Sequence, residues 1–572
     1  MQYFKRKTAE KIYEAITELT ENAGLSAEEI NSLLEYPPDP EMGDIAFPCF
    51  RLSKVLRSAP PKIAAELAEK TADFDLGTSQ AVGGYLNFKM SYKYLSNNVL
   101  GDIEEKGDRY GSSNIGRGKN VVLDYSSPNI CKPFHIGHLG TTVIGHSLKL
   151  LHEFLGYNCI GINYLGDWGT QFGKQIVAFR KWGDKKVIDE GGIDELVKLY
   201  VKFHAEAEKD PSLNDEARAE FHKLEEGDPD NVALWKWFVS VSLAEYKKTY
   251  KQLGIEFDSY KGESFYTDKM PAQVEKLRAR GLLKIDDGAS IVDLSEYNMP
   301  PCLILKKDGS TLYPTRDIAA AVYRKETYDF DKCIYVTSSA QSLHFAQWFK
   351  VVELMGYDWY DKLVHVPYGT VSVDGAKLAT RTGNVVLLKD LLRQSIEKVQ
   401  NIINEKSPDL ENKDDVSEAV GVGAIVFNYL YNSRIKDINF TLDQALSFEG
   451  NTGPYAQYTY ARMCSILDKA SSVCIATEMS GNITHESEAA LLKTLSIFPE
   501  KVLSAVAEYE PSTITRYIIE VCSAFNRFYR DCPIISADDE NVRSFRIRLT
   551  KASKSILGNA LHLICMKAPE KI

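Results

Sequence analysis

The chain has 572 residues, of which 44% are hydrophobic and 26% are charged, and its formal net charge is -11. These proportions are typical of globular proteins and exclude a wholly disordered chain, a collagen and a mucin. No stretch of the sequence approaches the roughly 20 consecutive apolar residues that cross a bilayer, so we expect no membrane partner.

The N-terminal residues and the cysteines both favour a cytoplasmic protein. The basic residues 5–7 are not followed by an apolar core, and Glu10 and Glu14 are unusual in a mitochondrial transit peptide. The 10 cysteines are scattered, with no C-x-x-C pair and no zinc-ligand spacing. We therefore expect reduced thiols and no metal site. The acidic balance argues only weakly against a nucleic-acid partner, because local basic patches decide that contact.

The first predicted unit is a small α+β domain over residues 1–110. Ile12, Ile16 and Leu19 mark one apolar stripe at helical spacing, and a second helix is predicted after Pro60. A glycine turn at 83–84 then leads into a predicted strand over residues 85–90. The glycine- and serine-rich stretch 111–118 reads as a linker.

The second predicted unit is a Rossmann-type catalytic domain over residues 119–390. A strand at 121–125, a helix through Leu151 and a strand at 159–164 follow one another, which is the βαβ pattern of a parallel sheet. The pattern returns with a strand at 333–336, a helix at 341–355 and a strand near 364–366. Between these halves, residues 180–290 are charged and predicted to form a helical insertion.

The last predicted unit is almost wholly helical. We divide it into a connecting segment, 391–440, and a helical bundle, 441–572. The predicted fold class is therefore multidomain α/β: a Rossmann-type parallel-sheet domain between an N-terminal α+β domain and a C-terminal all-α bundle.

The most informative motif is the string from Asn129 to His138, N-I-C-K-P-F-H-I-G-H, which directly follows the first strand of the predicted sheet. Open α/β sheets bind ligands at the carboxyl ends of their strands, and the N-terminus of a helix favours phosphate. His135 and His138 lie on either side of Gly137, a residue that leaves room for a base. The alternative is a turn with two ordinary polar histidines, but this context favours an adenine nucleotide.

This string is the H-I-G-H signature of class I aminoacyl-tRNA synthetases. The stretches 124–139 and 163–173 resemble the arginyl-tRNA synthetases in particular, and the resemblance runs from the N-terminal domain to the A-P-E-K string at 568–571. The class also has a K-M-S-K-S loop that binds the phosphates of ATP. Here the matching segment is 377–386, in which Lys377 matches the first lysine and Thr380 replaces the second.

The resemblance implies an ATP site and a set of catalytic residues. Lys132 occupies the place just upstream of H-I-G-H where arginyl enzymes often carry a lysine, and it is expected to compensate for Thr380. For both lysines, Lys132 and Lys377, an ordinary solvated loop is the alternative. The implied catalytic residues are His135, His138, Lys132 and Lys377. The implied ATP-binding residues are His135, Gly137, His138, Lys377, Thr380 and Arg381.

A guanidinium substrate needs an anion, and a carboxylate can bind it through two parallel hydrogen bonds. Tyr313 and Asp317 are spaced so that a first helical turn would bring them together, although an Asp at such a place is more often a helix cap. In the arginyl family the matching residues bind arginine. The implied arginine-binding residues are Asp124, Asn129, His138, Tyr313, Asp317 and Gln341.

Two further segments are similar to the tRNA-binding parts of the family. The string 448–458 resembles the anticodon-binding domain, which implies that Tyr455, Tyr458 and Tyr529 contact RNA bases by stacking. An aromatic stripe at helical spacing is more often part of a core. Tyr85 and Asn87 match family positions that meet a base of the tRNA D-loop, and their ordinary interpretation is an alternating strand.

The resemblance thus implies an arginine–tRNA ligase that uses L-arginine, ATP with Mg²⁺ and tRNA(Arg), and we expect a monomer. Three alternatives remain open. A synthetase for another amino acid would lack the pair of Tyr313 and Asp317. A small nucleotidylyltransferase can share an H-x-G-H motif but would not need the helical C-terminal region. A non-catalytic RNA-binding relative would be expected to have lost His135 and His138.

Overall fold

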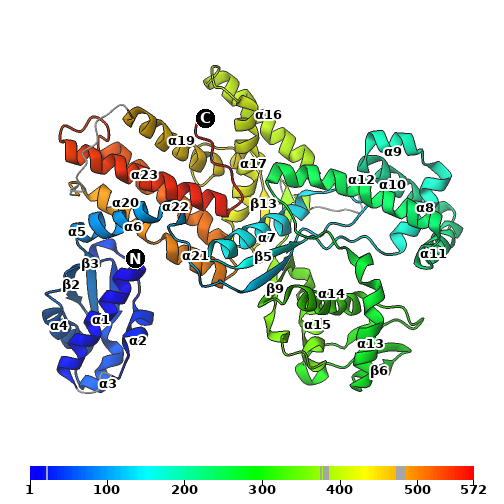
Figure 1. The fold of residues 1–572 in the computed structure, drawn as a ribbon, viewed down its shortest axis with the longest axis horizontal. Helices are drawn as coiled ribbons and strands as arrows, with labels where there is room; N and C mark the ends of the chain where they lie inside the picture. Colours follow the sequence, from blue (N-terminus) through cyan, green and yellow to red (C-terminus); the bar gives the residue numbers. More distant parts are fainter. Residues whose placement is uncertain (21–23, 374–375, 378–385, 472–482) are drawn as a thin grey trace.

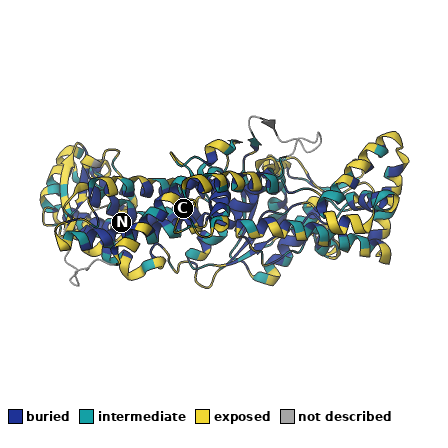
Figure 2. Cartoon of the chain, turned by 90° about the horizontal axis from the view of Figure 1, so that it is seen from above, coloured by how far each residue is buried: buried dark blue, intermediate teal, exposed yellow. Residues whose placement is uncertain are grey.

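A computed structural model describes residues 1–20, 24–373, 376–377, 386–471 and 483–572. The molecule is elongated (Figure 1), with the N-terminal unit at one end, a parallel sheet near the centre and a module of helices at the other end. Buried residues lie along the inner faces of the central elements, and exposed residues are most frequent in the outer helices (Figure 2). No helix among the described residues combines the length and the apolar composition that a membrane crossing requires.

The N-terminal unit is a three-stranded antiparallel sheet with helices. The strands lie in the order β1-β3-β2, and the apolar side chains of the central strand are buried with those of the first helix. The side chains of a strand alternate between its two faces, so Tyr85, Asn87 and Lys89 lie on the face opposite to this core. The elements of this unit are α1 (Gln2–Leu19), α2 (Ala27–Leu33), β1 (Ile45–Pro48), α3 (Ser53–Leu56), α4 (Pro60–Lys70), β2 (Gly77–Val82) and β3 (Tyr85–Met90).

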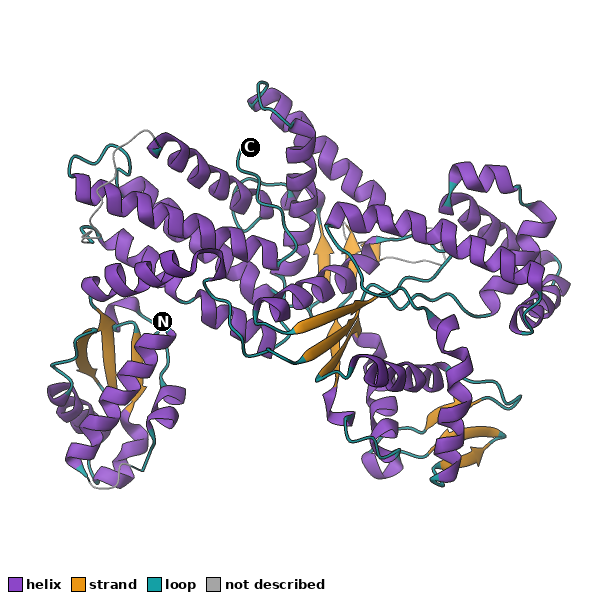
Figure 3. Cartoon of the chain, viewed as in Figure 1, coloured by secondary structure: helices purple, strands orange, loops and turns teal. Residues whose placement is uncertain are grey.

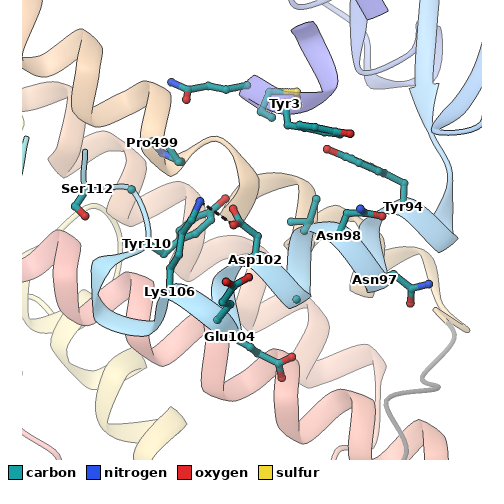
Figure 4. A pocket seen from close by; sticks show the side chains of 16 residues that line it. Tyr3, Tyr94, Asn97, Asn98, Asp102, Glu104, Lys106, Tyr110, Ser112 and Pro499 are labelled. Carbon is teal, nitrogen blue, oxygen red and sulfur yellow. Dashed lines mark ion pairs between the residues drawn. The ribbon is translucent and has the colours of Figure 1, made fainter. Parts of the chain in front are cut away.

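The N-terminal unit is followed by α5 (Tyr92–Tyr94), the helical turn Leu95–Val99 and α6 (Leu100–Lys106), and the last two of these contact helices of the C-terminal region. A cavity of about 880 Å³ lies at this junction, between Tyr3, Tyr94 and Pro499 (Figure 4). In its wall Lys106 pairs with Asp102 at 2.7 Å. The residues that line the cavity include Asp102, Glu104 and Glu105, and they include none of the residues singled out by the sequence motifs. It is therefore a junction between units and not the site suggested by the sequence motifs.

The central sheet has four parallel strands in the order β10-β9-β4-β5. Helix α7 (Ile136–Phe154) connects β4 to β5, and its apolar face packs on the strands. Residues 121–123 in β4 are fully buried, as expected for a strand covered on both faces. The predicted fold class is confirmed. The strands are β4 (Asn120–Asp124), β5 (Asn158–Ile162), β9 (Lys332–Ser338) and β10 (Leu363–Tyr368).

The region between β5 and β9 begins with helices, as predicted, but does not remain helical to residue 290. It ends in an antiparallel sheet of β6 (Leu283–Asp286), β7 (Ala289–Val292) and β8 (Cys302–Leu305). Asp287 and Gly288 both have positive φ and form the two-residue turn of a hairpin, for which Asp-Gly is a preferred sequence. The helices are α8 (Thr170–Trp182), α9 (Lys185–Gly191), α10 (Ile193–Lys209), α11 (Ser212–Glu225), α12 (Pro229–Leu253) and α13 (Met270–Ala279).

Two helices and three short strands complete the region around the sheet. Helix α14 (Tyr313–Tyr328) precedes β9, and α15 (Ser342–Leu354) connects β9 to β10. The short strand β11 (Val371–Val373) pairs with β12 (Ala376–Lys377) and with β13 (Ile438–Phe440). β13 is the one strand assigned in the described part of the region beyond residue 390, which was predicted to be almost wholly helical.

The C-terminal region is a set of packed helices (Figure 3). Its amphipathic helices bury their apolar faces in a common core, which is the expected source of stability in such a bundle. The helices are α16 (Leu388–Lys406), α17 (Lys413–Tyr431), α18 (Leu442–Ala445), α19 (Gly453–Ala470), α20 (Glu486–Ser496), α21 (Phe498–Ala507), α22 (Ser512–Asp531) and α23 (Glu540–Leu563).

Candidate functional site

The predicted nucleotide motif lies where strand order changes direction. From β4 the chain moves to β5 on one side, whereas β9 pairs with β4 on the other side. Ligands of open α/β sheets bind in the crevice at such a point. Ser126 and Ser127, which directly follow β4, both have positive φ, a strained backbone for serine. Tyr246 holds the loop by donating its hydroxyl to the carbonyl oxygens of Asn129 and Lys132, each at 2.7 Å.

The two histidines of the motif contact each other at the N-terminus of α7. His135 caps the helix by accepting the backbone N–H of Gly137 at 3.1 Å. His138 accepts the backbone N–H of His135, and the ring centroids lie 3.9 Å apart. Burial lowers the pKa of His138 to about 3, and the nearby His135 contributes to that shift. Burial also lowers the pKa of His135, with a smaller contribution from the positive charge of Lys132. Both rings are therefore neutral near pH 7.

The segment that follows the K-M-S-K-S counterpart is attached to this motif. Ile136 donates its backbone N–H to Val386, and Leu388 donates to Phe134. On the other side of the segment, Lys377 lies in β12, and its backbone pairs with β11. Thr380 and Arg381 lie outside the described residues. The strands and the helix start on either side of the loop are thus positioned beside α7.

A cavity of about 490 Å³ opens at the carboxyl ends of β4 and β9. Its walls come from the loop after β4, from α7 and from α14 and α15 with the turn before α15. All the residues predicted to bind arginine line this one cavity, although they come from distant parts of the sequence. They are Asp124, Asn129, His138, Tyr313, Asp317 and Gln341.

Two carboxylates of the cavity pair with basic side chains and are partly accessible. Asp317 Oδ2 lies 2.6 Å from His344 Nε2, with the side chains 21% and 28% exposed. Glu263 pairs with Arg316 at 2.8 Å. Burial raises the pKa of Glu263 to about 7; Arg316 opposes this shift, and Asp317 adds to it. Sequence reasoning did not identify Glu263, Arg316 or His344.

A third carboxylate, that of Asp124, is deeply buried. Its partner is Arg324 at 2.7 Å, and Ser127 donates its hydroxyl to the other carboxylate oxygen at 2.9 Å. The Arg324 guanidinium also lies over the rings of Tyr164 and Tyr335, at 5.2 and 5.4 Å. Burial raises the pKa of Asp124, and the charge of Arg324 opposes that rise. The charge of Asp124 is thus balanced within the protein, whereas Asp317 is more accessible to a ligand.

A second cavity, of about 530 Å³, adjoins the first one. Ser338 and Tyr368 belong to the walls of both cavities. Gly137 of the H-I-G-H motif lines the second cavity, whose other walls come from β11, β13 and Tyr429 of α17. Two adjoining cavities, one with accessible carboxylates and one beside the N-terminus of α7, match the demands of an amino acid and a nucleotide that react with each other.

The predicted RNA-facing tyrosines of the C-terminal region form one surface on α19 and α22. Tyr458 and Tyr529 are 42% and 45% exposed, and Arg462 lies between them, 4.9 and 5.3 Å from their ring centroids. Arg462 donates to Asn526 at 2.8 Å, and Asn526 donates to the hydroxyl of Tyr455 at 2.9 Å. We call these five residues the α19–α22 surface.

In the N-terminal unit, Tyr85 and Asn87 lie on one face of β3. The ring of Tyr85 packs edge-on against exposed Phe50, with centroids 5.3 Å apart. Asn87 is 3% exposed, and its Oδ1 atom has no hydrogen-bond partner among the described residues. A buried acceptor without a partner is costly.

A parallel sheet whose first strand leads through an H-I-G-H turn into a helix is the catalytic arrangement of class I aminoacyl-tRNA synthetases. Family models match the chain over three ranges. They describe tRNA synthetases class I (R), catalytic domain, at 102–442; the DALR anticodon binding domain at 456–572; and the arginyl tRNA synthetase N terminal domain at 6–90.

Curated relatives and a solved structure agree with these matches. The chain is 51% identical over 575 residues to an arginine–tRNA ligase of Alkaliphilus metalliredigens (strain QYMF), and 50% identical over 570 residues to one of Clostridium perfringens (strain 13 / Type A); each alignment covers 100% of both chains. The arginyl-tRNA synthetase structure of Thermus thermophilus superimposes with a TM-score of 0.82 at 25% identity, covering 98% of this chain and 99% of that one. The chain belongs to the arginyl-tRNA synthetase family.

Proposed function

We propose that this chain is an arginine–tRNA ligase. In the first step, the carboxylate of L-arginine attacks the α-phosphate of ATP, which gives arginyl-adenylate and releases pyrophosphate. In the second step, a hydroxyl of the terminal ribose of tRNA(Arg) attacks the arginyl carbonyl, and AMP leaves. The observation that carries the proposal is the cavity in which Asp317 and Glu263 offer carboxylates beside the nucleotide motif.

The charges in this cavity favour arginine among the amino acids. A guanidinium needs a planar anion, and Asp317 is the carboxylate that is accessible while held by a hydrogen-bonding partner, His344. Tyr313, 65% exposed at the start of α14, stands at the rim of the cavity. Asn129 and Gln341 supply neutral polar groups, which suit the amino and carboxylate groups of the substrate.

We assign ATP to the second cavity. Gly137 lines this cavity and leaves room for the adenine ring. His135 and His138 lie on either side of Gly137 in the chain, and their neutral imidazoles would provide hydrogen bonds to the nucleotide rather than a fixed charge. The exposed Lys132 and the strand residue Lys377 would neutralise the developing charge on pyrophosphate, together with Thr380 and Arg381 of the loop. Catalysis then rests on positioning and charge stabilisation, without a covalent enzyme intermediate.

Mg²⁺ is expected to arrive with the phosphates of ATP. Within the described ranges, no group of three or more His, Cys, Asp or Glu side chains is placed to hold a metal ion. The ligand chemistry fits a metal that is bound mainly by ATP.

Two parts of the chain are proposed to bind tRNA(Arg). The α19–α22 surface of the helical bundle, 441–572, would receive anticodon bases by stacking on Tyr458 and Tyr529. Tyr85 and Asn87 of the N-terminal unit, 1–110, would receive a base of the D-loop, and the half-buried ring of Tyr85 lies on the face of β3 opposite to the core. We further propose that the enzyme works as a monomer in the cytoplasm.

The test is aminoacylation of total tRNA with each of the standard amino acids in turn. Charging with arginine alone supports the proposal. Charging with another amino acid would assign the cavity to a different substrate, and no charging would leave an RNA-binding role. Arginine-dependent exchange between pyrophosphate and ATP, with and without tRNA, then asks whether adenylate formation needs bound tRNA, as the resemblance to arginyl enzymes implies.

A further inference from the structure

The stretch 163–173 follows β5 and contains none of the residues predicted to bind a substrate. Its one acidic residue, Asp167, is 5% exposed. The Asp167 carboxylate forms no ion pair within the part of the chain that the structure describes. A buried carboxylate is costly without compensation, so hydrogen bonds must stabilise this one.

The hydrogen bonds of Asp167 hold the turn 262–264. Ser264 donates its backbone N–H to Oδ1 of Asp167 at 2.8 Å and its hydroxyl to Oδ2 at 2.7 Å. A Cβ atom at Gly262 would lie 2.5 Å from Cγ of Asp167, so glycine is needed for this close approach. Between these two residues, Glu263 donates its backbone N–H to the carbonyl oxygen of Leu165 at 2.9 Å. The backbone on both sides of Glu263 is thus fixed to residues 165–167.

The fixed turn presents the side chain of Glu263 to the cavity at the carboxyl ends of β4 and β9. Glu263 Oε2 pairs there with Arg316 at 2.8 Å, and the two side chains are 16% and 12% exposed. Asp167 itself lies outside the lining of that cavity. Any effect of Asp167 on a ligand of the cavity must therefore pass through Glu263.

The charges around Glu263 couple it to Asp167. Burial raises the pKa of Glu263 to about 7; Arg316 opposes this shift, whereas Asp317 and Asp167 add to it. Burial also raises the pKa of Asp167, and the hydrogen bonds from Ser264 and the charge of Arg316 oppose that rise. One guanidinium thus serves two buried carboxylates, and a cationic ligand would supply the charge that is missing.

Two further titratable groups face Glu263. The buried phenol of Tyr164 lies near its carboxylate, and the Tyr164 hydroxyl has no hydrogen-bond partner among the described residues. His344 of α15 is bound to Asp317 at 2.6 Å. Asp167 differs from both groups, because it acts on Glu263 through its charge and also holds the backbone on which the Glu263 side chain stands.

We propose that Asp167 is a positioning residue for the choice of amino acid: by holding the turn 262–264 and by its charge, it controls how the Glu263 carboxylate is presented to the cationic end of the substrate. This inference rests on the proposed function, because it assumes that the cavity binds arginine. It gives the stretch 163–173 a part in substrate selection. The alternative is a buried carboxylate that only stabilises the fold.

The first experiment tests whether Asp167 acts through Glu263. Asp167→Ala removes both hydrogen bonds to Ser264 and should raise the arginine KM by about tenfold, with kcat and the ATP KM within about twofold of the wild type. The same substitution in a Glu263→Gln background should add less than about twofold, because the group that Asp167 positions is already lost. Independent losses that multiply in the double variant overturn the proposal.

Trp235 of α12 provides a matched control. Its Nε1 atom donates to the backbone carbonyl oxygen of Asp167 at 2.8 Å, so Trp235→Phe loses a hydrogen bond to the same residue but leaves the carboxylate in place. We expect lower thermal stability, with an arginine KM within about twofold of the wild type. A rise as large as that of Asp167→Ala would assign the effect to the stability of the turn alone and overturn the proposal.

The pH profile keeps the proposal testable if Asp167→Ala does not fold. Asp167→Asn removes the charge, while its amide can still accept the Ser264 N–H and donate to the Ser264 hydroxyl. The arginine KM of the wild type should rise by up to about tenfold from pH 8 to pH 6, because Glu263 takes up a proton. Without the negative charge of Asp167, the pKa of Glu263 should fall, and the rise should shrink to about threefold or less. An unchanged pH profile overturns the proposal.

Arginine charging by the wild type, at saturating ATP and tRNA, reports on the proposed function itself. If the wild type does not charge tRNA with arginine, the proposed function fails before any variant is compared. If the wild type charges arginine and Asp167 and Glu263 behave as independent residues, only the inference about Asp167 fails.

Discussion

The cavity at the carboxyl ends of β4 and β9 and the α19–α22 surface both contain arginine side chains, but these arginines are placed in opposite ways. In the cavity, Arg324 is 1% exposed and its charge is balanced by Asp124. On the surface, Arg462 lies between the exposed rings of Tyr458 and Tyr529 and is oriented by a neutral amide, that of Asn526. In the cavity the positive charge is neutralised inside the protein, whereas on the surface it remains available to a ligand.

This difference indicates how each region selects its ligand. A buried ion pair contributes little net stability, but it fixes the geometry around it. We therefore interpret the pair of Arg324 and Asp124 as a fixed part of the cavity wall. Asp317 remains the accessible anion for a cationic ligand. The α19–α22 surface instead combines a cation with aromatic faces, which is suited to an RNA loop. Under the proposed function, charge would select the ligand of the cavity, and stacking would select the ligand of the surface.

The largest expected effect comes from removing the accessible anion of the cavity. Asp317→Ala leaves a guanidinium partly desolvated without its partner, which costs on the order of 3 kcal/mol or more. The arginine KM should rise by about a hundredfold, and the ATP KM should change little. Steady-state aminoacylation at saturating tRNA measures both values. Asp317→Asn keeps a polar group beside His344 and should lose nearly as much, because it also removes the charge. An unchanged arginine KM would remove Asp317 from the substrate site.

Removing one stacking ring should give the next largest effect, which is expected in the tRNA affinity and not in the arginine KM. Tyr458→Ala should weaken tRNA binding by roughly 1–3 kcal/mol if the ring stacks on a base. The arginine and ATP KM values should stay near those of the wild type at saturating tRNA. Equilibrium tRNA binding and thermal unfolding are measured together.

Tyr460 on the same helix is the matched control. Its ring lies near Lys554 and Gly558 of α23, inside the bundle, so Tyr460→Ala should lower thermal stability with little effect on tRNA affinity. If Tyr458→Ala behaves in the same way as Tyr460→Ala, the Tyr458 ring belongs to the core, and the contrast between cavity and surface fails.

Sequence reasoning reached the fold class and the position of the nucleotide motif because both depend on local patterns. The short apolar run of β4 and the cap of α7 by His135 are encoded within a few positions. The hairpin at Asp287 and Gly288 was also encoded locally, and it was missed because the charged residues around it were read as helix.

The ion-pair partners inside the cavity could not be predicted from local sequence patterns. Glu263 lies 54 positions before Asp317 and enters the cavity only through tertiary packing. Arg324 had a signal, since Tyr313, Asp317 and Arg324 recur at helical spacing on one face of α14. That pattern places an arginine side chain in a cavity that is proposed to bind the amino acid arginine. The arrangement is explained only by the ion pair between Arg324 and Asp124 of β4. Charge balance in a buried site is a property of the assembled fold.

The pH dependence of arginine binding tests the second carboxylate of the cavity, with a smaller expected effect. The pKa of Glu263 is raised to about 7 by burial, so this side chain takes up a proton as the pH falls from 8 to 6. The cavity then loses negative charge, and the arginine KM should rise by up to about tenfold over that interval. Glu263→Gln should show a flatter profile, measured with saturating ATP and tRNA. An equally steep profile in Glu263→Gln would assign the titration to another group.

The smallest effect is expected from one hydroxyl group of the α19–α22 surface. Tyr455→Phe keeps the ring but removes the oxygen that accepts a hydrogen bond from Asn526 at 2.9 Å. Because Asn526 also orients Arg462, the loss should lower the free energy of unfolding by about 1 kcal/mol and weaken tRNA binding by less than the loss of a ring. Tyr458→Phe is the control, since that hydroxyl has no hydrogen bond among the residues described here, and it should stay within about 0.5 kcal/mol of the wild type. Denaturant unfolding measures both variants. If Tyr455→Phe weakens tRNA binding as strongly as Tyr458→Ala, the hydroxyl itself contacts RNA, and the surface reads its ligand by hydrogen bonds as well as by stacking.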